Sequence, residues 1–313
     1  MVELTDDAAI ASLRQHFPAL QTKAYFNFGG QGVLPDVARD ELLAAYSHLE
    51  TCGPFSRAAN DWILERLQAA RGAIASHLGT QPERVMLTES TTHGMNVPLW
   101  GLDWQPGDRV LLSDAEHYGV WNIVKQLQAR FGIEADTCAL MRADDPVETL
   151  ERHLTPRTRM VSICHVLWNS GRVMPLADLA RCCRDRGVLL HSDAAQSAGV
   201  MPLDVEALGV DFYAFAGHKW FCGPAGVGAL YLSERGQEFV QPTYSGWRYT
   251  YAPENSAEQF EVATLAYPLY LAWHAALTFH DRFAPVADRY ARQVRQAREL
   301  WQKLRSLPGV TCL

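Results

Sequence analysis

The sequence lacks the cysteine pattern and the long hydrophobic runs of disulfide-linked or membrane proteins. Its 313 residues include seven cysteines with no C-x-x-C spacing, so neither a disulfide framework nor a zinc site is expected. The hydrophobic runs are far shorter than the roughly 20 residues that a membrane helix needs. The first residues are acidic and amphipathic, unlike a secretory signal. We therefore expect a protein of the reducing cytoplasm that has no metal site and no membrane partner.

Positive charge is also scarce. The chain has 28 Lys and Arg against 35 Asp and Glu, a formal net charge of −7, and it contains no run of basic residues. Such a chain is a poor binder of nucleic acid. Hydrophobic residues make up 48% of the sequence, which suffices for a sizeable core in one large domain or two unequal ones.

Several common site motifs are missing as well. No G-x-G-x-x-G follows a strand, and G-x-x-x-x-G-K-[ST], G-x-S-x-G and H-E-x-x-H do not occur. A nucleotide-dependent enzyme is therefore disfavoured. Segment 223–228 is rich in glycine, but it precedes a strand. Because a phosphate-binding loop precedes a helix, we expect a tight turn there.

The sequence does contain an alternation of short β-rich runs with amphipathic helices. This alternation predicts parallel βαβ units in an α/β fold, with a doubly wound and mostly parallel seven-stranded sheet. Ligands of such sheets bind beyond the carboxyl ends of the strands. The expected strands are Val85–Thr88, Val110–Asp114, Ala135–Leu140, Met160–His165, Val188–Asp193, Asp211–Phe215 and Gly228–Leu232.

The helical patterns have recognisable ends. Hydrophobic residues over 63–74 share one face, with a cap expected at Asn60 or Asp61 and a stop at Gly79. Further helices are expected over Val120–Arg130, Leu176–Arg186 and Asp281–Leu307.

The pattern predicts three parts of the chain. They are an N-terminal segment (1–25), a large domain (26–270), and a long helix that leads into a small C-terminal domain (271–313). The last residues, Gly309–Leu313, are typical of the start of a strand. We therefore expect the small domain to be incomplete.

Lys219 stands in the most informative stretch. It follows an apolar strand and is flanked by Trp220 and Phe221. Burial lowers the pKa of a lysine and supplies the neutral amine that Schiff-base chemistry requires. On this fragment alone, the alternative is a lysine that extends past the aromatic rings to solvent.

Three other segments place polar groups after strands. Asp193 ends an apolar strand, where it could pair with the cationic ring nitrogen of pyridoxal phosphate (PLP) or simply cap a helix. Thr91 and Thr92 open a helix that could bind phosphate or carry an ordinary Ser/Thr cap. His117 could stack on a ring and move protons, or be structural.

Together these residues resemble the class V aminotransferases, a group of fold-type I PLP enzymes that includes cysteine desulfurases. The resemblance rests on Asp193-x-x-Gln196 followed by Gly217-His-Lys-Trp220, in order with Glu116-His117 and Phe260-Glu-Val-Ala-Thr264. Within the group, Tyr25–Gly32 and Tyr244-x-Gly-Trp-Arg248 are most similar to the cysteine/cystine C–S lyases.

The resemblance implies roles for individual residues. Lys219 would form the Schiff base and act with His117 in catalysis. Asp193 would pair with the ring nitrogen of PLP and Gln196 with its phenolic oxygen, while His117 would stack on the ring. The phosphate would be held by Thr91, Thr92, His218 and, from the other subunit of a homodimer with a shared active site, Thr264. Residues near the amino-acid substrate would be Asn27, Asn169, Trp247 and Arg248.

The sequence departs from the family pattern in two places. Ala216 stands where relatives have Ser or Thr before Gly-His-Lys, so one hydroxyl is absent at the phosphate. The family's C-terminal domain supplies an arginine for the substrate carboxylate and, in desulfurases, a nucleophilic cysteine, and neither can be placed here.

The resemblance implies a PLP-dependent lyase that eliminates sulfur from cysteine, cystine or a related S-substituted amino acid. Pyruvate, ammonia and a sulfide or persulfide would be the products. Cysteine desulfurase, aminotransferase and epimerase activities remain open, because all of them need Lys219 and Asp193. A fold relative that binds PLP without turnover is a further alternative.

Overall fold

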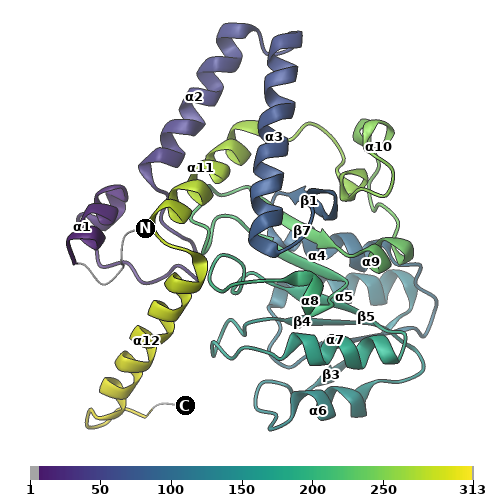
Figure 1. Ribbon diagram of the computed structural model, residues 1–313. Helices are drawn as coiled ribbons and strands as arrows, with labels where there is room; N and C mark the ends of the chain where they lie inside the picture. Colours follow the sequence, from purple (N-terminus) through teal and green to yellow (C-terminus); the bar gives the residue numbers. More distant parts are fainter. Residues whose placement is uncertain (1–6, 312–313) are drawn as a thin grey trace.

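A seven-stranded sheet forms the centre of the computed structural model, which describes residues 7–311 (Figure 1). The strand order is β1-β7-β6-β5-β4-β2-β3. Strands β2 to β6 are parallel where they pair, and β7 runs antiparallel to β1 and β6. The predicted mostly parallel α/β sheet is thus confirmed. The strands are β1 (Val85–Thr88), β2 (Arg109–Ser113), β3 (Glu134–Cys138), β4 (Thr158–Cys164), β5 (Leu189–Asp193), β6 (Phe212–Ala216) and β7 (Gly228–Leu232).

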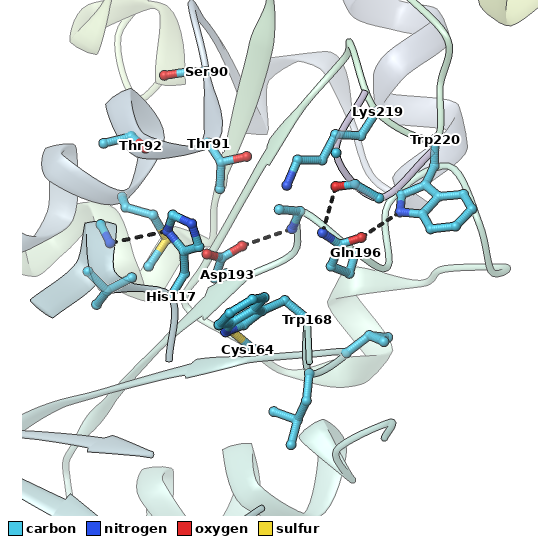
Figure 2. Close-up of a pocket in the computed structure, with 18 of the residues that line it drawn as sticks. Ser90, Thr91, Thr92, His117, Cys164, Trp168, Asp193, Gln196, Lys219 and Trp220 are labelled. Atoms are coloured by element: carbon cyan, nitrogen blue, oxygen red, sulfur yellow. Dashed lines mark hydrogen bonds between the residues drawn. The ribbon is translucent and has the colours of Figure 1, made fainter. Parts of the chain in front are cut away.

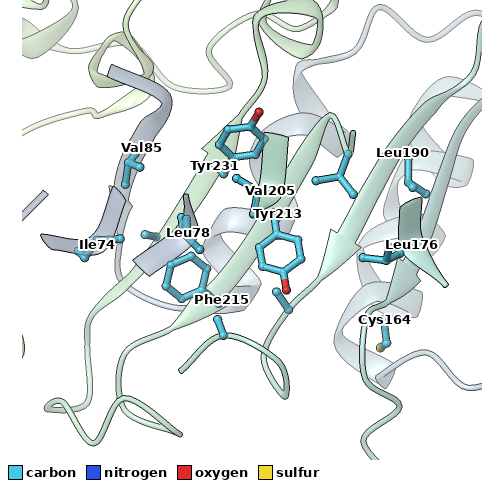
Figure 3. Close-up of a cluster of buried hydrophobic side chains, with 14 of the residues drawn as sticks. Ile74, Leu78, Val85, Cys164, Leu176, Leu190, Val205, Tyr213, Phe215 and Tyr231 are labelled. Atoms are coloured by element: carbon cyan, nitrogen blue, oxygen red, sulfur yellow. The ribbon is translucent and has the colours of Figure 1, made fainter. Parts of the chain in front are cut away.

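Alternate residues of each strand face two different hydrophobic layers, because side chains of a strand alternate across the sheet. In β6, Phe212 and Ala214 pack on the side of helices α4 and α5. Tyr213 and Phe215 pack on the opposite side, shown in Figure 3, with α3, α6, α7 and α8. The sheet is therefore covered on both faces. These helices are α3 (Arg57–Leu78), α4 (Thr91–Gly101), α5 (Tyr118–Phe131), α6 (Pro146–His153), α7 (Leu176–Asp185) and α8 (Val205–Leu208).

Helix α3 begins earlier than the sequence pattern predicts. The hydroxyl of Ser56 accepts a hydrogen bond from the Ala59 N–H at 3.1 Å, so Ser56 is the cap and the predicted cap at Asn60 or Asp61 is wrong. The pattern missed it because the first turn of α3 carries few buried residues. The predicted stop is confirmed, since Gly79 has a left-handed φ of 69°.

The long helix expected over Asp281–Leu307 is present as α12 (Val286–Arg305), but its predicted start is wrong, because Asp281–Phe283 belong to the preceding helix α11. Ala284, which precedes a proline, has extended backbone angles of −162° and 149° and separates α11 from α12. Helix α11 packs on α2, whereas α12 extends away from the sheet (Figure 1). The remaining helices are α1 (Asp7–Gln15), α2 (Asp36–Cys52), α9 (Glu234–Phe239), α10 (Trp247–Tyr251), α11 (Tyr267–Phe283), α12 (Val286–Arg305) and three short 3₁₀ turns, Pro18–Leu20, Pro82–Arg84 and Ala257–Phe260.

The glycine-rich segment before β7 forms a turn, and the C-terminal residues that the structure describes do not form a strand. Gly226 has a φ of 89°, and the glycine-rich segment 223–228 is the predicted turn into β7. The strand expected from Gly309 does not form over residues 309–311, and Cys312 and Leu313 lie outside the described residues. Within residues 7–311, none of the helices is both long and apolar enough to cross a membrane.

Candidate active site

A cavity of about 720 Å³ lies beyond the carboxyl ends of β4, β5 and β6. This is where a doubly wound sheet binds its ligands. The start of α4, the loop before α5 and the N-terminal residues 26–30 complete its walls. Eight of the predicted site residues line it: Asn27, Thr91, Thr92, His117, Asp193, Gln196, His218 and Lys219.

Lys219 enters this cavity from the loop that follows β6 (Figure 2). Gly217 makes this loop possible, since a Cβ there would lie 2.6 Å from Cε2 of the buried Trp273. Burial lowers the pKa of Lys219, and the nearby charge of Asp193 only partly opposes that effect. The amine therefore gives up its proton more easily than a lysine in water.

Asp193 is the last residue of β5 and is only 8% exposed. Its Oδ1 accepts the N–H of Ala195 at 2.9 Å. Burial raises the pKa of Asp193, while that hydrogen bond and the charges of Lys219 and His117 favour its ionised form. A buried carboxylate of this kind is stabilised by a cation placed beside it in the cavity.

One end of the cavity has the features of a phosphate site. The hydroxyl of Ser90 caps α4 by accepting the N–H of His93 at 3.1 Å, so the remaining first-turn amides and the positive end of the helix dipole are available. Two buried polar atoms belong to residues that line the cavity: Thr91 Oγ1, from the first residue of α4, and His218 Nδ1. Neither atom has a hydrogen-bond partner within the described part of the chain. These features fit a bound phosphate group.

His117 caps α5 in the part of the wall next to Thr92, whose Oγ1 would lie 3.8 Å from a Cβ on Gly119. Its Nδ1 accepts the N–H of Gly119 at 3.1 Å, so the neutral ring carries its proton on Nε2. The ring of Trp168 approaches edge to face, with 6.0 Å between the centroids. Trp168 is 51% exposed and lies at the cavity wall near His117 (Figure 2). This tryptophan was missed as a site residue, although it directly precedes Asn169, which the resemblance placed near the substrate.

A polar pair beneath the cavity was also missed by the sequence reasoning. Glu116 is buried and accepts the hydroxyl of Ser113 and the N–H of Cys164, the latter at 2.9 Å. Cys164 lines the cavity, and its sulfur lies 3.1 Å from the other Glu116 oxygen. Burial raises the pKa of Glu116 to about 7. Its position directly before His117 was the available signal.

Four predicted residues do not line the cavity in this chain. Arg248 is buried elsewhere, with Nη2 2.7 Å from Glu261 Oε2. Asn169 contacts the sulfur of Met141 at 3.5 Å. Trp247, on α10, and Thr264 are exposed. The cavity of a single chain therefore does not bring these four residues to the predicted substrate or phosphate positions.

Comparisons with known proteins identify the family of this chain. The family model described as aminotransferase class-V matches residues 44–313. The chain is 31% identical to an isopenicillin N epimerase of Streptomyces clavuligerus over 75% of this chain and 59% of the relative. It is 29% identical to a probable cysteine desulfurase of Methanothermobacter thermautotrophicus, over 79% of this chain and 63% of that relative. The chain thus spans about three fifths of the length of these curated relatives.

Two solved structures are more similar still. The cystine C–S lyase C-DES, in complex with its reaction product cysteine persulfide, has a TM-score of 0.91 and 43% identity over 95% of this chain and 82% of that one. A lysine-to-alanine variant of C-DES, with glycine covalently linked to its PLP cofactor, gives a TM-score of 0.91 and 42% identity, with 96% and 82% covered. The predicted family, fold type and cofactor are confirmed: the chain belongs to the aminotransferase class-V family of PLP-dependent enzymes.

Proposed function

We propose that this protein is a PLP-dependent carbon–sulfur lyase that acts on cysteine, cystine or a related S-substituted amino acid. The observation that carries the proposal is the meeting of Lys219, Asp193 and the start of α4 in one cavity. These groups match the aldehyde, the pyridine nitrogen and the phosphate of PLP, respectively. The 43% identity to the cystine C–S lyase C-DES supports the lyase branch of the family.

Each residue has a task in this proposal. PLP, when bound, accepts the electron pair left on the substrate α-carbon and so makes the C–S bond at the β-carbon labile. Lys219 removes the α-proton, a task that suits an amine whose pKa is lowered by burial. Asp193 holds the proton of the ring nitrogen in place. Thr91 and His218 bind the phosphate, and His117 covers the ring.

The overall reaction balances for cystine. The Cα–H and Cβ–S bonds break, and the sulfur leaves with a proton as cysteine persulfide. Water completes the conversion of the remaining three-carbon fragment to pyruvate and ammonia. No external oxidant or reductant is needed.

Cysteine desulfurase is the main alternative function, because the chain is similar both to a probable cysteine desulfurase and to a cystine C–S lyase. A desulfurase needs a thiolate that attacks the substrate sulfur. Among the described residues, Cys164 is the cysteine that lines the cavity, and burial raises its pKa well above that of an ordinary thiol. A neutral, buried thiol is a poor nucleophile, so Cys164 is a poor candidate for that thiolate.

We further propose a homodimer in which Thr264 reaches the phosphate of the other subunit. Asn27, which lines the cavity, would lie near the substrate. The same role is proposed for Asn169, Trp247 and Arg248. The division into segments 1–25, 26–270 and 271–313 is part of this proposal. The six described cysteines are all free thiols, which supports a reducing, cytoplasmic setting.

The test is to incubate the PLP-loaded protein with cystine and to measure pyruvate and alanine in the same samples. A lyase yields pyruvate, whereas a desulfurase acting on cysteine yields alanine. Lys219→Ala is the control and should abolish either product. Alanine as the main product would contradict the lyase proposal, and product formation by Lys219→Ala would contradict the assigned site.

A further inference from the structure

The amide of Gln196 is oriented by two partners that line the same cavity, Trp220 and Gly29. Its Oε1 accepts the indole N–H of Trp220 at 2.8 Å, and its Nε2 donates to the backbone carbonyl of Gly29 at 3.0 Å (Figure 2). An indole N–H can only donate and a carbonyl can only accept. The two ends of the amide therefore cannot exchange places without losing both hydrogen bonds.

This orientation decides what Gln196 offers to a ligand. Nε2 carries two hydrogens, and Gly29 uses one of them. Since Gln196 lines the cavity, the second hydrogen is left for a ligand, while the acceptor oxygen is occupied by Trp220. The side chain thus favours an anionic oxygen over a hydroxyl donor at this point of the cavity.

Trp220 is itself held in place by packing. Its ring stacks on Phe28, with 6.3 Å between centroids and 22° between planes. Phe28 precedes Gly29, so the N-terminal segment supplies both the stacking partner of Trp220 and the acceptor for Gln196. Gly32 lies close behind, and a Cβ there would meet the Lys219 carbonyl oxygen at 2.0 Å. The segment is therefore packed tightly against the Lys219 loop.

We propose that Trp220 is a positioning residue that makes Gln196 a hydrogen-bond donor toward the phenolic oxygen of the cofactor. Trp220 acts only through Gln196 in this proposal. The inference rests on the proposed function, because it assumes that PLP occupies the cavity next to Lys219.

The proposal has a spectroscopic consequence. A donor on an anionic oxygen lowers the affinity of that oxygen for a proton. Without Trp220 the amide of Gln196 can rotate and present its oxygen instead, which removes the donor for part of the time. The pH at which the visible absorbance of the PLP-loaded protein changes should then rise, by about 0.5 to 1 unit.

The experiment is a pH titration of visible absorbance for wild type, Trp220→Phe, Gln196→Leu and the double variant. Trp100→Phe is the matched control. Trp100 Nε1 also donates to an amide oxygen, Oδ1 of Asn96, at 2.9 Å. Neither Trp100 nor Asn96 lines the cavity. We expect Trp220→Phe to raise the midpoint, Trp100→Phe to leave it unchanged, and Trp220→Phe to have no further effect in the Gln196→Leu background.

Two results would overturn the inference while leaving the proposed function intact. One is a Trp220→Phe protein that binds PLP and titrates like the wild type. The other is a shift that persists undiminished in the Gln196→Leu background. If Trp220→Phe does not fold, Trp220→Met, which also lacks the N–H donor, takes its place. A wild type that takes up no PLP contradicts the proposed function itself, and the inference falls with it.

Discussion

The carboxylate of Glu116 joins the ends of two neighbouring strands by binding Cys164. It accepts the Cys164 backbone N–H at 2.9 Å and lies 3.1 Å from its sulfur. Cys164 is paired in register with Asp193 on the adjacent strand. A second acidic group therefore lies beneath the cavity, one strand away from the carboxylate that would bind the cofactor ring.

This relationship predicts a pH-dependent effect of Glu116→Gln on stability. Burial raises the pKa of Glu116 from 4.5 to about 7 in the folded protein. Its protonated form is thus favoured by folding, and the stability it contributes is lost as the pH rises through about 7. Between pH 5 and 8, the free energy of unfolding of Glu116→Gln should rise relative to the wild type, by about 2 to 3 kcal/mol. Urea denaturation of the wild type and of Glu116→Gln, both without PLP, measures the two free energies of unfolding at each pH. A difference between them that stays constant from pH 5 to 8 would contradict the prediction.

The buried ion pair between Arg71 and Glu261 predicts a large loss of stability on Arg71→Met. Their atoms are 2.7 Å apart, with side chains 1% and 0% exposed. Glu261 also accepts the N–H of Leu87 in β1. Arg71→Met leaves the buried Glu261 carboxylate with Arg248 but without its second cationic partner. We expect a cost of about 3 kcal/mol, the low end of the range for a broken buried ion pair.

Thermal or urea unfolding measures this loss. The matched control is Arg57→Met, which breaks an exposed ion pair of α3 with Asp61 and should cost less than about 1 kcal/mol. Equal losses of stability in Arg71→Met and Arg57→Met would refute the structural role of the Arg71–Glu261 ion pair.

Thr91→Val tests the phosphate end of the cavity. The variant keeps the shape of the side chain but removes the buried hydroxyl, which has no partner among the described residues. If that hydroxyl binds a phosphate, its loss should weaken PLP affinity about tenfold or more. Equilibrium titration with PLP, followed by absorbance, gives the affinity.

Thr137→Val is the control for this prediction. Thr137 is an exposed residue of β3, at the edge of the same sheet and outside the cavity. Its replacement should leave PLP affinity unchanged. Equal affinities of Thr91→Val and wild type would show that the phosphate binds elsewhere.

The strands and the centre of the site could be predicted because their signals are local. Most strands are short apolar runs, and Asp193 stands where one of these runs ends. Strand β3, whose sequence is largely polar, is the exception. The cap of α3 and the break before α12 depend on single residues, Ser56 and Ala284. The broad hydrophobic pattern therefore placed those ends incorrectly.

Arg248 shows why other residues could not be placed from the sequence. Its two acidic partners, Glu258 and Glu261, approach it only after α10 and the following turn have folded back. The motif that contains Arg248 carries no sign of this pairing. The orientation of Gln196 is similar, since its partners Trp220 and Gly29 are 24 and 167 residues away along the chain.

The most direct test of the account is to locate the bound cofactor on the chain. The PLP-loaded protein is reduced with borohydride, digested and analysed by peptide mass spectrometry. The account predicts the cofactor on the peptide that contains Lys219 and no label on the other lysines, Lys23, Lys125 and Lys303. Label on one of those lysines in place of Lys219, or retention of the label by Lys219→Ala, would contradict it.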